Sequence, residues 1–131
     1  MNAQATEAVF RHKLVLINVN RTGKDPKVPL LDAVRYSWKI SPVRAEKADY
    51  ILAVIDGIIV GAFEAEEWLP DTKENFPEFS PKDRPWGMRN GRWAFKGGEA
   101  PAAVQALYID KRVPTELRKH GAANPIRYVG I

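Results

Sequence analysis

Short apolar runs rich in β-branched residues alternate with turn residues along most of the chain. Five such runs predict strands, at residues 13–19, 50–55, 58–63, 92–96 and 125–129. Asp56-Gly57 joins two of them, and this pair between β-rich runs is the strongest short-range signal for a hairpin. Gly61 in the second arm predicts a bulge or a close approach of another backbone. Gly97-Gly98 is expected to end the fourth strand.

Helical patterns lie between the strands. Residues 30–38 place apolar side chains at helical spacing and finish with Trp38, which predicts one short amphipathic helix. Ser41 can cap the next helical segment, which starts with a proline. The remaining helical or turn segments are predicted at residues 42–48, 101–108 and 114–119.

Strands with few and short helices between them favour an α+β domain. The pattern predicts a small β-barrel of about five or six strands with short helices packed outside. The 131 residues match the size of one domain, which we expect to cover residues 13–131 after an N-terminal extension at 1–12. Residues 69–91 contain four prolines and predict a long loop, of a kind that is usually functional.

The composition, with 45% hydrophobic and 27% charged residues, is that of a globular protein. No apolar run approaches the roughly 20 residues that cross a bilayer, so no membrane span is predicted. Residues 1–12 show no signal-peptide pattern, which leaves the cytoplasm as the expected location. The sequence has no cysteine, and His12 and His120 have no companions at ligand spacing. We therefore expect neither a metal centre nor a cofactor.

Charge is distributed unevenly along the chain. The net charge is +4, yet residues 64–83 hold seven acidic residues against two lysines. Arg84, Arg89, Arg92 and Lys96 then follow without an intervening acid, beside tryptophan and phenylalanine. Basic clusters beside aromatic residues suit a polyanion such as nucleic acid, although they can equally keep a small domain soluble. The acidic segment 64–83 is either a solvated face or a surface for a protein partner.

Three stretches carry a resemblance to a known family. They are LLDAVRYSWKIS, which contains Trp38, the hairpin YILAVIDGIIVGAFEAEEW, and WGMRNGRWAFKGGEAP, which contains Trp86. With the ending NPIRYV, they resemble the PUA-like superfamily and, within it, the YTH and EVE branch that binds modified bases. The resemblance implies a PUA-like barrel in which Trp38 forms one wall of a base pocket and Trp86 belongs to the second cage region. Lys39 and the loop 70–85 depart from the family pattern.

The implied pocket would hold a single-stranded or flipped base between Trp38 and Trp86, because aromatic faces stack on any base. Trp86 lies in a loop rich in proline and glycine, where an indole is more often a binding element, whereas Trp38 can equally belong to the core. Asn18 and Asn20 end the first strand and can read a base edge, because an amide donates and accepts; they can equally shape the turn. Phosphate contacts are predicted for Arg21, Lys39, Arg84, Arg89 and Arg92.

The sequence therefore predicts a domain that binds DNA or RNA and is not an enzyme. One alternative is a protein-interaction or regulatory module with the same fold. Another is a metal-dependent nuclease, which needs two acids on adjacent strands beside a lysine. Asp56 lies in the predicted hairpin turn and Asp71 follows a proline in the predicted loop, so the geometry disfavours this alternative. Trp68 and Trp93 are expected to be structural.

Overall fold

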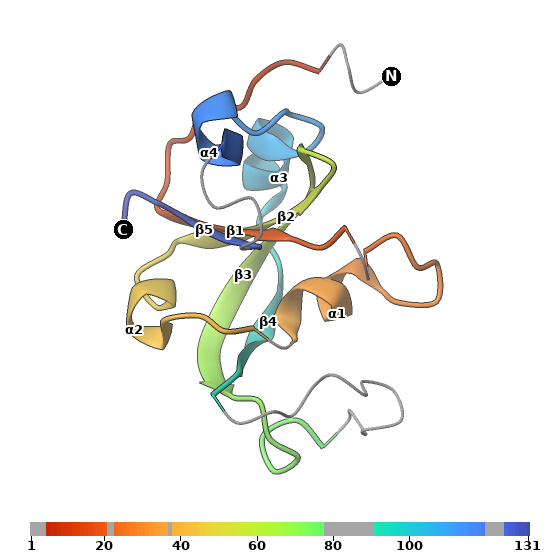
Figure 1. Cartoon of the computed structure of the whole chain (residues 1–131), viewed down its shortest axis with the longest axis vertical. Helices are drawn as coiled ribbons and strands as arrows, with labels where there is room; N and C mark the ends of the chain where they lie inside the picture. The colour runs from red at the N-terminus through yellow and green to blue at the C-terminus, as the bar shows by residue number, and fades with distance from the viewer. Residues whose placement is uncertain (1–4, 21–22, 37, 78–90, 120–124) are drawn as a thin grey trace.

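The computed structural model describes residues 5–20, 23–36, 38–77, 91–119 and 125–131, and of residues 118–119 only the backbone. Five strands form one mixed sheet in the order β4-β3-β2-β1-β5 (Figure 1). They are β1 (Leu14–Asn18), β2 (Tyr50–Ile55), β3 (Ile58–Pro70), β4 (Trp93–Glu99) and β5 (Ile126–Val129). Within the described residues the sheet is open, with β4 and β5 at its edges. The predicted α+β class is confirmed, and closure into a barrel stays a prediction.

Short helices cover both faces of the sheet. They are α1 (Leu30–Arg35), α2 (Pro42–Ala45), α3 (Ala102–Tyr108) and α4 (Thr115–Lys119). Figure 1 shows α1 and α2 on one side of the sheet and α3 and α4 on the other. None of these described helices has the length and apolar character that a membrane crossing requires.

The inner strand β1 is buried on both faces, which explains its continuous apolar run. Val15 and Ile17 join the core under α1 and α2, whereas Leu14 and Leu16 join the core under α3. β1 pairs in parallel with β2 and antiparallel with β5. The parallel pair requires a crossover connection, and residues 19–49 with α1 and α2 provide it.

The hairpin at Asp56-Gly57 is confirmed. Both residues have positive φ, 51° and 81°, as the central pair of a type I′ turn requires. The register of β2 and β3 shifts from Ala53 opposite Gly61 to Val54 opposite Ile59, which confirms the bulge. A Cβ added to Gly61 would lie 2.7 Å from Leu30 Cδ2, so α1 also approaches the strand closely here.

Two sequence expectations about element ends are wrong. The first helix ends at Arg35, and Tyr36 is already extended (φ −118°, ψ 143°), so Trp38 lies outside the helix. Gly97-Gly98 does not end the fourth strand, because β4 continues to Glu99. A Cβ on Gly97 would overlap the Glu64 carbonyl oxygen of β3. The glycine therefore allows the two backbones to lie close together and does not end the strand.

Strand β3 is longer than its apolar run predicted. It continues to Pro70 because its second half pairs with β4, from Phe63 opposite Glu99 to Pro70 opposite Trp93. The described part of the predicted N-terminal extension packs on the domain: Ala8 is buried and donates its N–H to the Arg112 carbonyl (2.8 Å).

Candidate functional site

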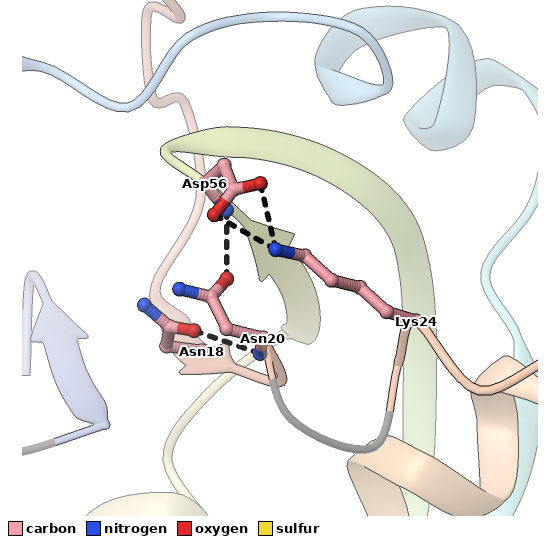
Figure 2. Close-up of polar contacts among 4 residues, drawn as sticks. All are labelled: Asn18, Asn20, Lys24 and Asp56. Atoms are coloured by element: carbon pink, nitrogen blue, oxygen red, sulfur yellow. Dashed lines mark hydrogen bonds and ion pairs between the residues drawn. The ribbon is translucent and has the colours of Figure 1, made fainter.

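The carboxyl ends of β1 and β2 meet a polar cluster, which we call the hairpin corner: Asn18, Asn20, Lys24 and Asp56 (Figure 2). Asn18 ends β1, and its Oδ1 accepts the backbone N–H of Asn20 (3.0 Å). Asn20 Oδ1 accepts the backbone N–H of Asp56 in the hairpin turn, 36 residues away, at 2.7 Å. The two asparagines thus form the turn-shaping bonds that the sequence left open as an alternative.

Lys24 closes the corner from the loop that follows β1. Its Nζ lies 3.0 Å and 3.3 Å from the two carboxylate oxygens of Asp56. Both side chains remain more than half exposed, at 53% and 62%. Just before it, the N–H of Gly23 donates to the Val19 carbonyl (2.7 Å), and a Cβ on Gly23 would lie 2.9 Å from Ile55 Cδ1. Gly23 is therefore packed tightly against Val19 and Ile55, at the ends of β1 and β2.

The amide groups of Asn18 and Asn20 are oriented by these bonds. Because each Oδ1 faces a backbone N–H, each Nδ2 is the group left for other partners, and both residues are exposed. Figure 2 shows both amide nitrogens on the side of the corner away from Lys24. The amides therefore offer donors to a ligand, whereas the sequence had suggested that they would both donate and accept.

Trp38 lies at the β4 edge of the sheet. Trp38 and Trp93 exchange two backbone hydrogen bonds, of 2.9 Å and 2.8 Å, in an antiparallel bridge. The indole Nε1 of Trp38 donates to the Val34 carbonyl (2.8 Å), one of the last acceptors of α1. Both tryptophans are half-buried. We call this pair the aromatic edge.

The tryptophans of the described residues share one face of the sheet. Residues directly opposite each other in an antiparallel pair point to the same side, which places Trp38 beside Trp93. Trp68 and Phe95 are opposite each other on β3 and β4, one pair further along on the same face, with ring centroids 5.0 Å apart. Trp68 is only 5% exposed and belongs to the core, in line with the structural role expected for it.

Basic residues lie next to the aromatic edge along the chain. Lys39 is exposed and follows Trp38, and Arg92 is half-buried and precedes Trp93. Arg35 donates from Nε to the Phe95 carbonyl (3.2 Å) and lies 3.5 Å from the Asp32 carboxylate. The edge of β4 is thus covered by α1 and the residues after it rather than left open for strand pairing.

Only part of the predicted site lies within the described residues. Trp86, Arg21, Arg84 and Arg89 lie outside the described residues, as does His120. The hairpin corner and Trp38 lie at the two ends of the segment 18–38. Between them α1 crosses the sheet, with Leu30 beside Gly61.

The two aspartates of the nuclease alternative lie in different surroundings. Asp56 lies in the hairpin turn and pairs with Lys24, whereas Asp71 is 2% exposed and its N–H donates to the Arg92 carbonyl (3.0 Å). The described residues contain no group of three or more acidic, histidine or cysteine side chains that could hold a metal ion.

His12 Nδ1 lies 2.6 Å from the hydroxyl of the fully buried Tyr108.

Comparisons of the chain with protein-family models, with curated proteins and with solved structures give no match.

Proposed function

We propose that this domain binds single-stranded nucleic acid, or a base flipped out of a duplex, at the aromatic edge. The observation that carries the proposal is the pairing of Trp38 with Trp93 on one face at a sheet edge, where both are half-buried and adjacent in sequence to basic residues. Half-buried indoles offer a ring face to a base while the rest of the side chain is held by the core. Because stacking tolerates any base, this edge alone does not select a sequence.

Basic side chains would supply the phosphate contacts. We assign these contacts to Lys39 and Arg92, the sequence neighbours of Trp38 and Trp93. Phosphate contacts position a strand without reading its sequence. Arg21, Arg84 and Arg89 belong to the same proposal through the charge pattern of the sequence, and Trp86 through the resemblance to the YTH and EVE branch. A modified base would be held where Trp86 joins Trp38.

A PUA-like barrel is the fold we propose to underlie this function. The backbone of Arg112 supports it, because it forms one isolated bridge with Ile58 at the start of β3 and another with Glu7 in the N-terminal segment. Sheet pairing thus continues beyond the hairpin on the side of α3. An additional contact of this kind is what curling of β3 around the core would produce.

The test is a titration of the intrinsic tryptophan fluorescence with short oligonucleotides, single-stranded and duplex, methylated and unmethylated, at two salt concentrations. We expect quenching that weakens as salt rises, because bound phosphates release counterions. In a plot of the logarithm of the binding constant against the logarithm of the salt concentration, Lys39→Gln should make the slope shallower by roughly 0.7, the value for one single-strand phosphate contact. Lys111→Gln, shortly after α3 on the other side of the sheet from α1, is the control.

A protein-interaction module is the second candidate. Glu64, Glu66 and Glu67 are exposed along β3 and belong to the acidic segment, as does the exposed Glu74 after the strand. An absence of any fluorescence response to every oligonucleotide would reject the nucleic-acid proposal and favour a basic protein partner at this strand.

A further inference from the structure

We propose that the buried indole N–H of Trp68 donates to an acceptor atom of the base that binds at the aromatic edge. Stacking on Trp38 and Trp93 tolerates any base. A fixed donor accepts only a base that turns a carbonyl oxygen or an unprotonated ring nitrogen towards it. Trp68 is then a specificity-determining residue. This inference rests on the proposed function and deepens it, because it adds the reading of a base edge to stacking.

The indole N–H of Trp68 is a buried donor that has no acceptor within the described residues. The side chain is only 5% exposed, and its Nε1 forms no hydrogen bond in this part of the chain. Trp38 provides the contrast, since its Nε1 donates to the Val34 carbonyl at 2.8 Å. Buried donors are nearly always satisfied in native proteins, and each exception calls for an explanation. An acceptor atom supplied by a ligand is such an explanation.

The sheet places this donor beside the aromatic edge. Trp68 on β3 lies opposite Phe95 on β4, and their ring centroids are 5.0 Å apart. Trp93 lies two residues before Phe95, at the position diagonal to Trp68 on the same face. Diagonal neighbours in an antiparallel pair are about 7–8 Å apart, which is within reach of an aromatic side chain. All of these rings pack in one hydrophobic cluster, together with Trp38.

Trp93 is the side chain that can open a path to this donor. It is half-buried, and its ring makes no ring contact with another described residue. Its backbone, by contrast, is held by two hydrogen bonds to Trp38. The indole can therefore turn aside without breaking the bridge, and side-chain rotations of this kind are common when a ligand binds. A base that enters there uncovers the donor and satisfies it in the same step.

The burial of Nε1 also favours an unpaired base. The acceptors on the Watson–Crick edge of a base are used by the complementary strand in a duplex, whereas a single-stranded or flipped base offers them to the protein. A hydrogen bond formed away from water is electrostatically stronger than one on the surface. One buried donor can therefore contribute measurably to affinity.

Two replacements remove the donor at Trp68. Trp68→Phe keeps an aromatic ring without Nε1, and site-specific incorporation of benzothienylalanine keeps the bicyclic shape with a sulfur in place of the N–H. Thymine offers two carbonyl oxygens, so a short oligothymidylate is the probe. We expect each replacement to weaken its binding about three- to tenfold, the value of one hydrogen bond. Agreement between the two separates the loss of the donor from the smaller volume of phenylalanine.

The stability of the free protein is a second readout that does not depend on a ligand. Benzothienylalanine at Trp68 should leave the midpoint of urea unfolding unchanged or raise it, because it removes a donor that lacks an acceptor. The same replacement at Trp38 is the matched control and should lower the midpoint, because it breaks the bond to the Val34 carbonyl. Equal losses at both positions would show that the Trp68 N–H is already satisfied in the free protein, which overturns the inference.

Heteronuclear NMR of the parent observes the donor directly. The indole N–H signal of Trp68, assigned by its disappearance in Trp68→Phe, should move downfield as oligothymidylate is added, as expected for a new hydrogen bond. Parent-like affinity in both Trp68 replacements, or a Trp68 signal that does not move at saturation, rejects the inference and leaves the proposed function standing. An absence of binding by the parent to every oligonucleotide rejects both.

Discussion

Trp38 and Trp93 face each other across a bridge in which each donates its backbone N–H to the carbonyl of the other. The bridge joins residues on either side of the long β2–β3 hairpin, and it holds the two indoles on one face of the sheet edge. Trp38 is also anchored through its Nε1 to α1. The aromatic edge is therefore a rigid platform whose geometry depends on both strand pairing and helix termination.

Removing either indole of this platform should weaken oligonucleotide binding. Because each ring offers one stacking face, we expect Trp38→Ala and Trp93→Ala each to reduce the binding free energy by about 1–3 kcal/mol. Adjacent rings share a ligand, so the double variant should lose less than the sum of the single losses. Fluorescence anisotropy of a labelled single strand measures this, with circular dichroism to confirm folding. Additive losses would place the two rings at separate contacts.

The glycine pair of β4 provides a matched test of close backbone approach. A Cβ on Gly97 would overlap the Glu64 carbonyl oxygen, whereas a Cβ on Gly98 would meet nothing within 4 Å. Gly97→Ala should therefore lower the free energy of unfolding by about 2 kcal/mol or more, and Gly98→Ala by no more than about 0.5 kcal/mol. Urea unfolding of both variants checks the difference. Equal losses would show that the glycines act only through chain flexibility.

The buried hydroxyl of Tyr108 connects α3 to the N-terminal segment. It accepts the backbone N–H of Arg11 at 3.0 Å and lies 2.6 Å from His12 Nδ1. A hydroxyl has one donor and two acceptor sites, so the direction of the bond to His12 Nδ1 is set by the imidazole tautomer. Tyr108→Phe should lower the free energy of unfolding by about 1–3 kcal/mol, because it leaves these groups without that partner. Tyr50→Phe, which keeps its ring against His12, is the control and should cost less than half as much.

Substitutions at the two central residues of the hairpin turn should differ in their effect on stability. Asp56→Asn preserves a residue type suited to positive φ, so the free energy of unfolding should change by less than about 0.5 kcal/mol. Gly57→Ala places a Cβ at φ 81°, where it should cost about 1–2 kcal/mol. Thermal unfolding of both variants measures the difference. A strongly destabilised Asp56→Asn would mean that the exposed Lys24–Asp56 ion pair supports the fold.

Local sequence determined the elements whose signals lie within a few residues. The Asp56-Gly57 turn, the Ser41 cap of α2 and the bulge at Gly61 all follow from the conformations that these residues prefer. The buried strand β1 also follows directly, because an apolar run of its length must be covered on both faces. The α+β class follows from the order of these elements.

The tertiary structure decided the features that depend on distant partners. The helical spacing of residues 30–38 extends to Trp38, but pairing with Trp93 takes that residue into the sheet. A Gly-Gly pair commonly ends a strand, but here β3 lies so close that Gly97-Gly98 is part of β4. The orientation of the Asn20 side-chain amide depends on the backbone N–H of Asp56, 36 residues away. Spacing and propensity describe near neighbours along the chain, whereas these roles are assigned by residues that only folding brings into contact.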